Sequence, residues 1–243
     1  MLTRTREGRI LRLTLARAEK RNALSAALAG ALVDALRGAN ADSAVGVILL
    51  DAEGSTFCSG MDLDDAPASD PWRLNQIHAE LFAMRAVLVK PLVAAVSGSA
   101  FGGGLGLVAN AHIAIASDEA QFGLTELRVG MWPFMIWPAI SAAIGERRAI
   151  ELALTTRVFG AADALAYGLV HDVVARSRTA ARAEDVARQL AEASSETITR
   201  GLRAAANPSD ASALRAEQLV SPDFREGVVA FREKRAPRWP SRE

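Results

Sequence analysis

The first fifty residues show two hydrophobic periodicities in succession. Residues 9–16 alternate leucines with arginine and threonine, and this period of two predicts a strand with one buried face. In 26–37 the apolar residues recur at helical spacing, so we expect an amphipathic helix there, capped by Asn22 or Ser25. The continuous apolar run 45–51 predicts a strand buried on both faces. The chain therefore begins as strand, helix, strand.

The alternation of strand and helix continues along the chain. The pattern predicts helices at 74–88 and 104–111, strands at 92–98, 112–117 and 169–174, and a short element around 122. From about residue 134 the chain is mostly helical, and beyond about 178 helix follows helix. The expected fold class is α/β, with a core over 1–177 that holds the functional site and a C-terminal helical region over 178–243.

Composition and charge narrow the class of protein. The chain has 243 residues, half of them apolar, which fits one globular domain with a core of its own. Lysine plus arginine and aspartate plus glutamate number 28 each, so no net field attracts nucleic acid or an anionic membrane. The lone Cys58 and the absence of a signal-peptide segment lead us to expect a cytoplasmic protein. No apolar run approaches the roughly 20 residues of a membrane span.

Two glycine-rich segments, 55–63 and 98–106, each follow a predicted buried strand. Ligands of α/β proteins bind at the ends of strands, and glycine lets backbone N–H groups approach a ligand closely. A helix N-terminus adds unpaired donors and the positive end of its dipole, which favours an anionic oxygen. The alternative is that these glycines only permit close packing of strand on helix.

Several motifs of other enzyme classes are absent from the sequence. The G-x-G-x-x-G fingerprint is not matched, because Leu107 stands at the position of its last glycine. No G-x-x-x-x-G-K-[ST] occurs either, so the sequence does not indicate binding of a nucleotide phosphate. No G-x-S-x-G occurs either, which argues against a serine hydrolase. His78, His112 and His171 lack metal-ligand spacing, so we expect no metal. His112 begins an apolar strand and is expected to be a hydrogen-bonded core residue.

Four segments together resemble the crotonase (enoyl-CoA hydratase/isomerase) family. In the order and spacing of that family they are RAEKRNALS (17–25), TFCSGMDL (56–63), GSAFGGGLGLVANAHIAIASDEAQFGLTEL (98–127) and ELALTTRVFGAADALAYGLVHDVV (151–174). The likeness extends from about residue 9 to EGVVAFREKRAP near the C-terminus. It implies a spiral of β-β-α repeats, and C-terminal helices that assemble the chain into a homotrimer or a dimer of trimers.

The resemblance also implies a substrate and a site. The substrate would be an acyl-CoA thioester, with no separate cofactor because CoA is part of the substrate. The backbone N–H groups of Met61 and Gly103 would hold the thioester oxygen, and one such donor is worth about 10²–10³ in rate. The residues implied near the CoA portion are Lys20, Arg21, Asp62 and Leu63 and, from a neighbouring subunit, Phe231 and Lys234.

The carboxylates of this chain depart from the family pattern. Hydratases of the family have two glutamates, whereas here Gly106 stands at the first position and Glu126 at the second. Trp132 and Phe134 lie where the family usually has a glycine-rich loop, so they would border the acyl chain, and an apolar surround would raise the pKa of Glu126. The alternatives are that Glu126 is a solvent-facing charge and that the aromatic residues are simply core.

A single carboxylate favours double-bond isomerisation, because one base can take a proton from one carbon and return it two bonds along. Hydration is the close alternative; it is a task that two acids share, and Asp64, Asp65 and Asp70 are candidates for a spare acid. A third possibility is an acyl-CoA-binding protein that has lost catalysis. We also expect a side chain at position 106 to face the thioester, so that Gly106→Glu would raise hydration.

Overall fold

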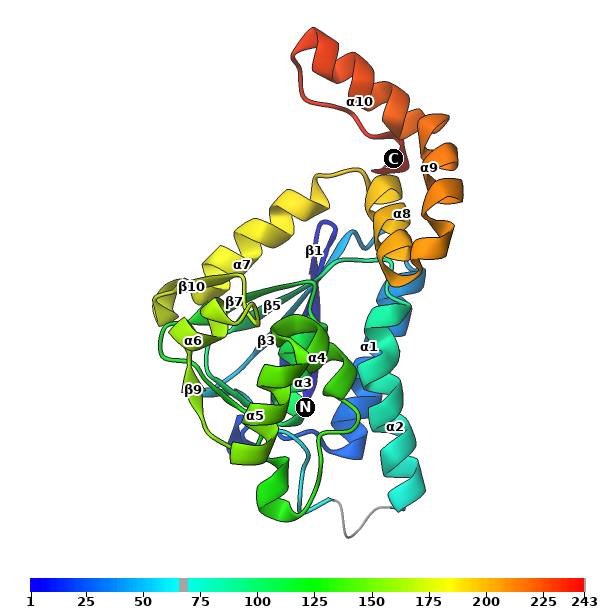
Figure 1. Cartoon of the computed structure of the whole chain (residues 1–243). Helices are drawn as coiled ribbons and strands as arrows, with labels where there is room; N and C mark the ends of the chain where they lie inside the picture. The colour runs from blue at the N-terminus through cyan, green and yellow to red at the C-terminus, as the bar shows by residue number, and fades with distance from the viewer. Residues whose placement is uncertain (66–69, 243) are drawn as a thin grey trace.

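The computed structural model describes residues 1–65 and 70–242, whose strands form two sheets (Figure 1). The larger sheet contains, in spatial order, β1 (Leu2–Glu7), β2 (Ile10–Leu15), β3 (Val47–Ala52), β5 (Leu92–Val96), β7 (Ile113–Ser117) and β10 (Asp172–Val174). Strand β1 pairs antiparallel with β2, and the other neighbours pair parallel. The smaller sheet contains β4 (Thr56–Cys58), β6 (Ser99–Phe101), β8 (Gln121–Gly123) and β9 (Phe159–Gly160).

Three times in succession the chain places one strand in the large sheet and the next strand in the small sheet. Strand β3 is followed by β4, β5 by β6, and β7 by β8. Helices α2 (Pro71–Ala83) and α3 (Gly103–Asn110) return the chain from the small sheet to the large one. This alternation confirms the expected spiral of β-β-α repeats. It also brings the ends of β4 and β6 together, because these strands pair in parallel.

Helix α1 (Ala26–Ala41) connects β2 to β3, and the hydrogen bonds at its N-terminus show which of the two candidate residues is the N-cap. The Ser25 hydroxyl accepts a hydrogen bond from the Leu28 N–H, so Ser25 is the N-cap. Asn22 is fully buried instead, and its side-chain amide donates to the carbonyls of Glu53 and Thr56. Asn22 therefore ties the start of α1 to the loop before β4.

The remaining described helices follow β8. They are α4 (Trp137–Ile144), α5 (Glu146–Thr155), α6 (Ala161–Ala166), α7 (Arg176–Ala191), α8 (Ser195–Ala206), α9 (Ala211–Leu219) and α10 (Pro222–Glu233). Short 3-10 helices lie at η1 (Ala18–Lys20), η2 (Met84–Ala86), η3 (Glu126–Val129), η4 (Pro208–Asp210) and η5 (Pro240–Arg242). Among the helices in the described residues, none is both long and apolar enough to cross a membrane.

Two apolar clusters enclose the large sheet. The main cluster fills the space between the sheets and their helices, and it includes Phe57, Leu105 and Phe122. On the other face, Ala183 and Ala187 of α7 pack against side chains of β3, β5 and β7. The domain boundary expected between residues 177 and 178 falls inside α7, which packs on the core. Helix α8 also contacts the core, since the Thr199 hydroxyl donates to the Val89 carbonyl, whereas α10 extends away from it (Figure 1).

Candidate active site

The two glycine-rich loops are in backbone contact where strands β4 and β6 end. Gly60 has a φ of +96°, and a Cβ placed on it would lie 3.0 Å from the Phe101 carbonyl oxygen and 3.3 Å from the Gly103 nitrogen. Only glycine both adopts this positive φ readily and fits the space between the loops. The approach of the loops brings Met61 and Gly103 to one cavity.

The N–H groups of Met61 and Gly103 are directed away from the local hydrogen bonds. Met61 forms an isolated parallel bridge with Leu24, in which the Leu24 N–H donates to the Gly60 carbonyl at 2.8 Å and the Asp62 N–H donates to the Leu24 carbonyl at 3.1 Å. Successive N–H groups of extended chain point to opposite sides, so the Met61 N–H points away from Leu24. Gly103 is the first residue of α3, where N–H groups have no partner within the helix.

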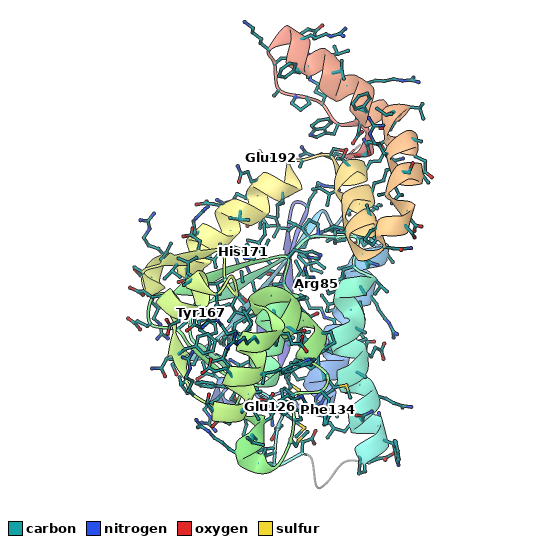
Figure 2. The ribbon with its side chains drawn as sticks, in the orientation of Figure 1. Arg85, Glu126, Phe134, Tyr167, His171 and Glu192 are labelled. Carbon is teal, nitrogen blue, oxygen red and sulfur yellow. The ribbon has the colours of Figure 1, made fainter. Side chains whose placement is uncertain are left out.

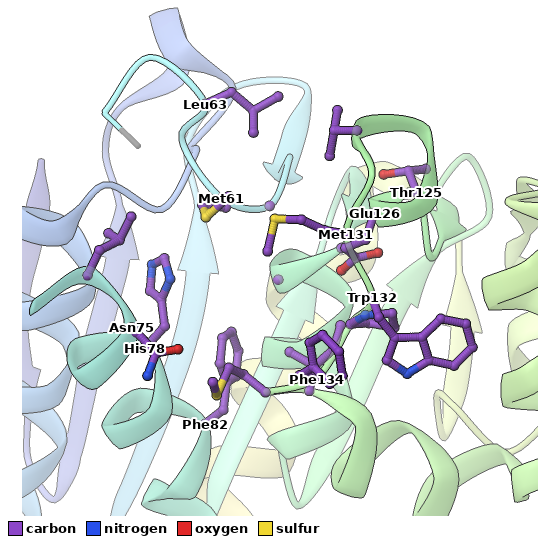
Figure 3. A pocket seen from close by; sticks show the side chains of 18 of the residues that line it. Met61, Leu63, Asn75, His78, Phe82, Thr125, Glu126, Met131, Trp132 and Phe134 are labelled. Atoms are coloured by element: carbon purple, nitrogen blue, oxygen red, sulfur yellow. The ribbon is translucent and has the colours of Figure 1, made fainter. Parts of the chain in front are cut away.

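These donors lie on one wall of a pocket of about 400 Å³, which we call the Glu126 pocket (Figure 3). Met61 and Leu63 line its first wall, α2 supplies a second, and residues 125–136 close the third. Trp132 and Phe134 belong to this third wall, and Trp132 packs against Trp137 with ring centroids 5.1 Å apart. The bulky residues after Glu126 therefore form an apolar wall beside the carboxylate, and Phe134 in this wall is itself 70% exposed.

Glu126 begins η3 and directs its carboxylate into the pocket (Figure 3). A Cβ on Gly102 would lie 2.9 Å from the Oε1 of Glu126, which places the carboxylate against the residue before Gly103. Its Oε2 is buried and has no hydrogen-bond partner in the described part of the chain. Burial raises the pKa of Glu126 above its ordinary value, although backbone hydrogen bonds at Glu126 and Thr125 oppose the rise. A carboxylate in this state is a stronger base than one in water.

Position 106 lies behind Ile136 and Phe82 of the Glu126 pocket, and it has no room for a side chain. A Cβ on Gly106 would lie 2.2 Å from the Cγ2 and 2.8 Å from the Cβ of Ile136, and 2.9 Å from the Cε1 of Phe82. Ile136 and Phe82 both line the pocket. The expectation that Gly106→Glu would simply add a carboxylate is therefore wrong, because Ile136 occupies the space.

The three aspartates considered as spare acids are engaged elsewhere. Asp64 pairs with the Lys20 ammonium at 2.8 Å, and Asp65 accepts the Ala26 N–H at 2.8 Å. Asp70 accepts the Trp72 N–H and caps α2. Among the described residues that line the pocket, Glu126 is the one acid.

The residues implied for CoA binding are spread over the molecule. Leu63 lines the mouth of the pocket and is half exposed, whereas the neighbouring Asp62 is 5% exposed and accepts a hydrogen bond from the Arg17 Nη1 at 2.5 Å. Burial alone would raise the pKa of Asp62, but the hydrogen bonds from Arg17 and from backbone N–H groups hold it below its ordinary value. Lys20 is exposed beside Asp64, and the carbonyl of Arg21 accepts the Ser59 N–H.

Phe231 and Lys234 are not brought to the pocket within one chain. Phe231 is 85% exposed on α10, and Lys234 ends that helix. Figure 2 shows Glu126 and Phe134 at the end of the molecule opposite to α10. These two residues can contribute to a site only in a neighbouring subunit.

Sequence reasoning missed two polar residues of the pocket, Asn75 and His78 on α2. The helix itself was expected, and Leu74, His78 and Leu81 form its buried face at helical spacing. A histidine at an apolar position of that face was the available signal.

A spiral of β-β-α repeats with the Met61 and Gly103 backbone beside one desolvated carboxylate is the arrangement expected of the crotonase class. The sequence profile described as enoyl-CoA hydratase/isomerase matches residues 5–242. The chain is 33% identical over 245 residues to the mevalonyl-coenzyme A hydratase of Aspergillus fumigatus, covering 95% of this chain and 91% of that protein. It is 35% identical over 187 residues to 4-chlorobenzoyl coenzyme A dehalogenase-2 of an Arthrobacter species, covering 72% and 66%.

The structural comparison agrees with the sequence comparison. The crystal structure of an enoyl-CoA hydratase from Mycobacterium smegmatis matches with a TM-score of 0.92 and 30% identity, covering 98% of each chain. The chain belongs to the enoyl-CoA hydratase/isomerase family, and it is an acyl-CoA-transforming enzyme of the crotonase class.

Proposed function

We propose that this enzyme isomerises the double bond of an unsaturated acyl-CoA by carrying one proton on Glu126. The observation that supports the proposal is that Glu126 is the one acid among the described residues of the pocket, while Ile136 fills the place at Gly106 where a second glutamate would stand. A reaction that returns the same proton to the substrate needs one carboxylate, whereas hydration has to position a water as well.

In the proposed reaction, the carbonyl oxygen of a 3-enoyl-CoA accepts hydrogen bonds from the N–H groups of Met61 and Gly103. The Glu126 carboxylate removes a proton from C2, and the electron pair of that C–H bond moves toward the carbonyl oxygen to form a dienolate. The two donors stabilise this charge because they are already oriented toward the oxygen. The protonated Glu126 then delivers its proton to C4, and the product is a 2-enoyl-CoA. No water is consumed, and no cofactor beyond the substrate's own CoA is required.

Hydration of a trans-2-enoyl-CoA is the second candidate, and the names of the relatives favour it. The Aspergillus protein and the Mycobacterium structure are both described as hydratases. In this chain such a reaction would have to use Glu126 together with a water held by groups other than a glutamate at position 106.

We also propose that the chain assembles through its C-terminal helices into a homotrimer or a dimer of trimers. Helices α8 and α9 contain no fully buried residue in the single chain, and Val220, Phe224 and Phe231 expose apolar surface around α10. Exposed apolar surface of this kind indicates contact with another protein surface. Assembly would also place Phe231 and Lys234 of one subunit near the CoA portion bound by another.

The experiment that tests the reaction compares Glu126→Gln with Glu146→Gln, a control at an exposed glutamate of α5 outside the pocket. We expect Glu126→Gln to lower kcat for a 3-enoyl-CoA by about 10²–10⁴-fold with little change in KM. The base must be ionised, so kcat/KM of the parent should fall as pH decreases through the raised pKa of Glu126. Unchanged isomerisation in Glu126→Gln would show that the base is another group. A parent that hydrates trans-2-enoyl-CoA faster than it isomerises 3-enoyl-CoA would make hydration the better assignment.

A further inference from the structure

The α2 wall of the Glu126 pocket carries two polar side chains, and the proposed reaction uses neither of them. Asn75 and His78 are three residues apart on α2, so they lie one turn apart on the same side of the helix. Figure 3 shows both across the pocket from Glu126 and Met131. The rest of this wall is apolar, and the His78 ring lies 6.4 Å from the ring of Phe82.

His78 has hydrogen-bonding capacity that the protein does not satisfy. The residue is 7% exposed, and its Nε2 is buried with no hydrogen-bond partner among the described residues. Buried polar atoms in proteins are nearly always hydrogen-bonded, so an exception at a ligand pocket points to a partner that the ligand supplies.

The surroundings of His78 favour the neutral imidazole. Burial lowers the pKa of His78 below its ordinary value, and the backbone of Leu24 and the charge of Asp65 oppose this only in part. Glu126 faces the ring across the pocket, and no lysine or arginine appears among the described pocket residues. A neutral imidazole presents one N–H donor and one lone pair, and the amide of Asn75 likewise both donates and accepts.

We propose that His78 and Asn75 form a subsite for a hydroxyl group on the acyl chain of the substrate. The proposal rests on the proposed function in one respect, namely that the thioester oxygen lies at Met61 and Gly103. A hydroxyl can donate to the Nε2 lone pair of the neutral imidazole, and it can both donate to and accept from the amide of Asn75. A carboxylate only accepts, and it would bring a second negative charge into an apolar pocket beside Glu126 without a cation to pair with it.

The test measures binding by calorimetry with saturated thioesters, which cannot be isomerised or hydrated. Butanoyl-, 4-hydroxybutanoyl- and succinyl-CoA form one series, and pentanoyl-, 5-hydroxypentanoyl- and glutaryl-CoA form another that places the polar group one carbon further. We expect one hydroxylated thioester to bind about tenfold more tightly than its unsubstituted parent, the size of one net hydrogen bond. The dicarboxylic thioesters should bind more weakly than either.

Variants on α2 assign the preference to the two residues. His78→Leu should reduce the hydroxyl preference to nearly one, and His78→Gln should restore part of it because the amide can also donate and accept. Asn75→Leu should weaken the preference. Gln76→Leu changes an exposed amide next along the helix that does not line the pocket, so it should leave the preference unchanged.

Three results would overturn the subsite. Equal affinity for hydroxylated and unsubstituted thioesters at both lengths would show that no such recognition exists. Tightest binding of the dicarboxylic thioesters would show that the wall recognises an anion. A His78→Leu variant that keeps the hydroxyl preference but loses turnover of unsubstituted 3-enoyl-CoA would make His78 an acid or base in the reaction. Failure of isomerisation itself leaves these binding ratios measurable, so it is distinguishable from failure of the subsite.

Discussion

Replacement of Gly106 by alanine is the most direct test of why this pocket has a single acid. The added methyl group would lie 2.2 Å from the Cγ2 of Ile136, 2.8 Å from its Cβ and 2.9 Å from the Cε1 of Phe82. Carbon atoms in contact are normally about 3.5–4.0 Å apart. The Cβ of Ile136 is attached directly to the backbone, so a change of rotamer cannot move it away. The substitution therefore requires a shift of the backbone of α3 or of residue 136.

Two effects of opposite sign decide the magnitude. Alanine is favoured over glycine in a helix interior by up to about 1 kcal/mol. Overpacking of a filled core costs about 1–3 kcal/mol, and occasionally more. Since two of the three contacts at position 106 are shorter than 2.9 Å, we take the upper end of that range. The free energy of unfolding should then fall by about 2 kcal/mol, rather than rise as helix propensity alone predicts.

Urea unfolding of matched glycine variants measures this balance. Gly38 lies in α1 with nothing within 4 Å of an added Cβ, so Gly38→Ala should stabilise the protein and serves as the control. In an Ile136→Ala background the loss caused by Gly106→Ala should shrink, because the methyl 2.2 Å away is gone. If Gly106→Ala stabilises the protein as much as Gly38→Ala does, position 106 has room. Our explanation for the missing glutamate would then be wrong.

Two further predictions concern the ion pair beneath the Met61 loop and the C-terminal helices. Asp62 has a pKa below its ordinary value in the folded protein. Its pairing with Arg17 therefore stabilises the fold fully at pH values above the ordinary pKa of aspartate, and this stabilisation is lost as the pH falls through the lower pKa of the folded state. Arg17→Met should lower the free energy of unfolding near pH 7 by roughly 3 kcal/mol and weaken its dependence on pH below about pH 4, as urea titrations can show. Light scattering should give a mass that is a multiple of 25.7 kDa, reduced by Val220→Asp or Phe224→Asp; a 25.7 kDa parent would contradict assembly.

The parts of the fold that the sequence predicted are those with a local signal. Strand β2 and helix α1 lie where the periods of two and of 3.6 residues placed them. Strand β1 was missed because five of its six side chains are exposed, which leaves no hydrophobic period. The strand forms by antiparallel pairing with β2, from Leu2 opposite Leu15 to Glu7 opposite Ile10. The strands of the small sheet are two or three residues long, too short for a period to appear. Their positions depend on the spiral, which the resemblance supplied.

The three histidines show where prediction of the site stops. All three stand near apolar segments of the sequence, and His112 was expected to be hydrogen-bonded in the core. The hydrogen bond is confirmed, because its Nδ1 accepts the Leu92 N–H at 3.0 Å, and burial lowers its pKa to about 4. The side chain is half-buried, however, and lies outside the fully buried core. His78 differs from the other two histidines in lining the Glu126 pocket, and this depends on which side of α2 faces the pocket. Likewise, the contact between Ile136 and Gly106 joins residues thirty positions apart, so no local pattern reveals it.

The glycine run at 102–104 packs closely at one end and lies against the Glu126 carboxylate at the other. A Cβ on Gly104 would lie 2.1 Å from the Cys58 carbonyl oxygen, so this glycine is required for packing of α3 on β4. A Cβ on Gly102 would instead meet the Glu126 carboxylate, and one on Gly103 would lie 3.6 Å from the Cα of Gly60 in the facing loop. Gly104 therefore packs against β4 and Gly102 lies against the base, with Gly103 between them. The close packing at Gly104 fixes the start of α3, and with it the direction in which the Gly103 N–H points.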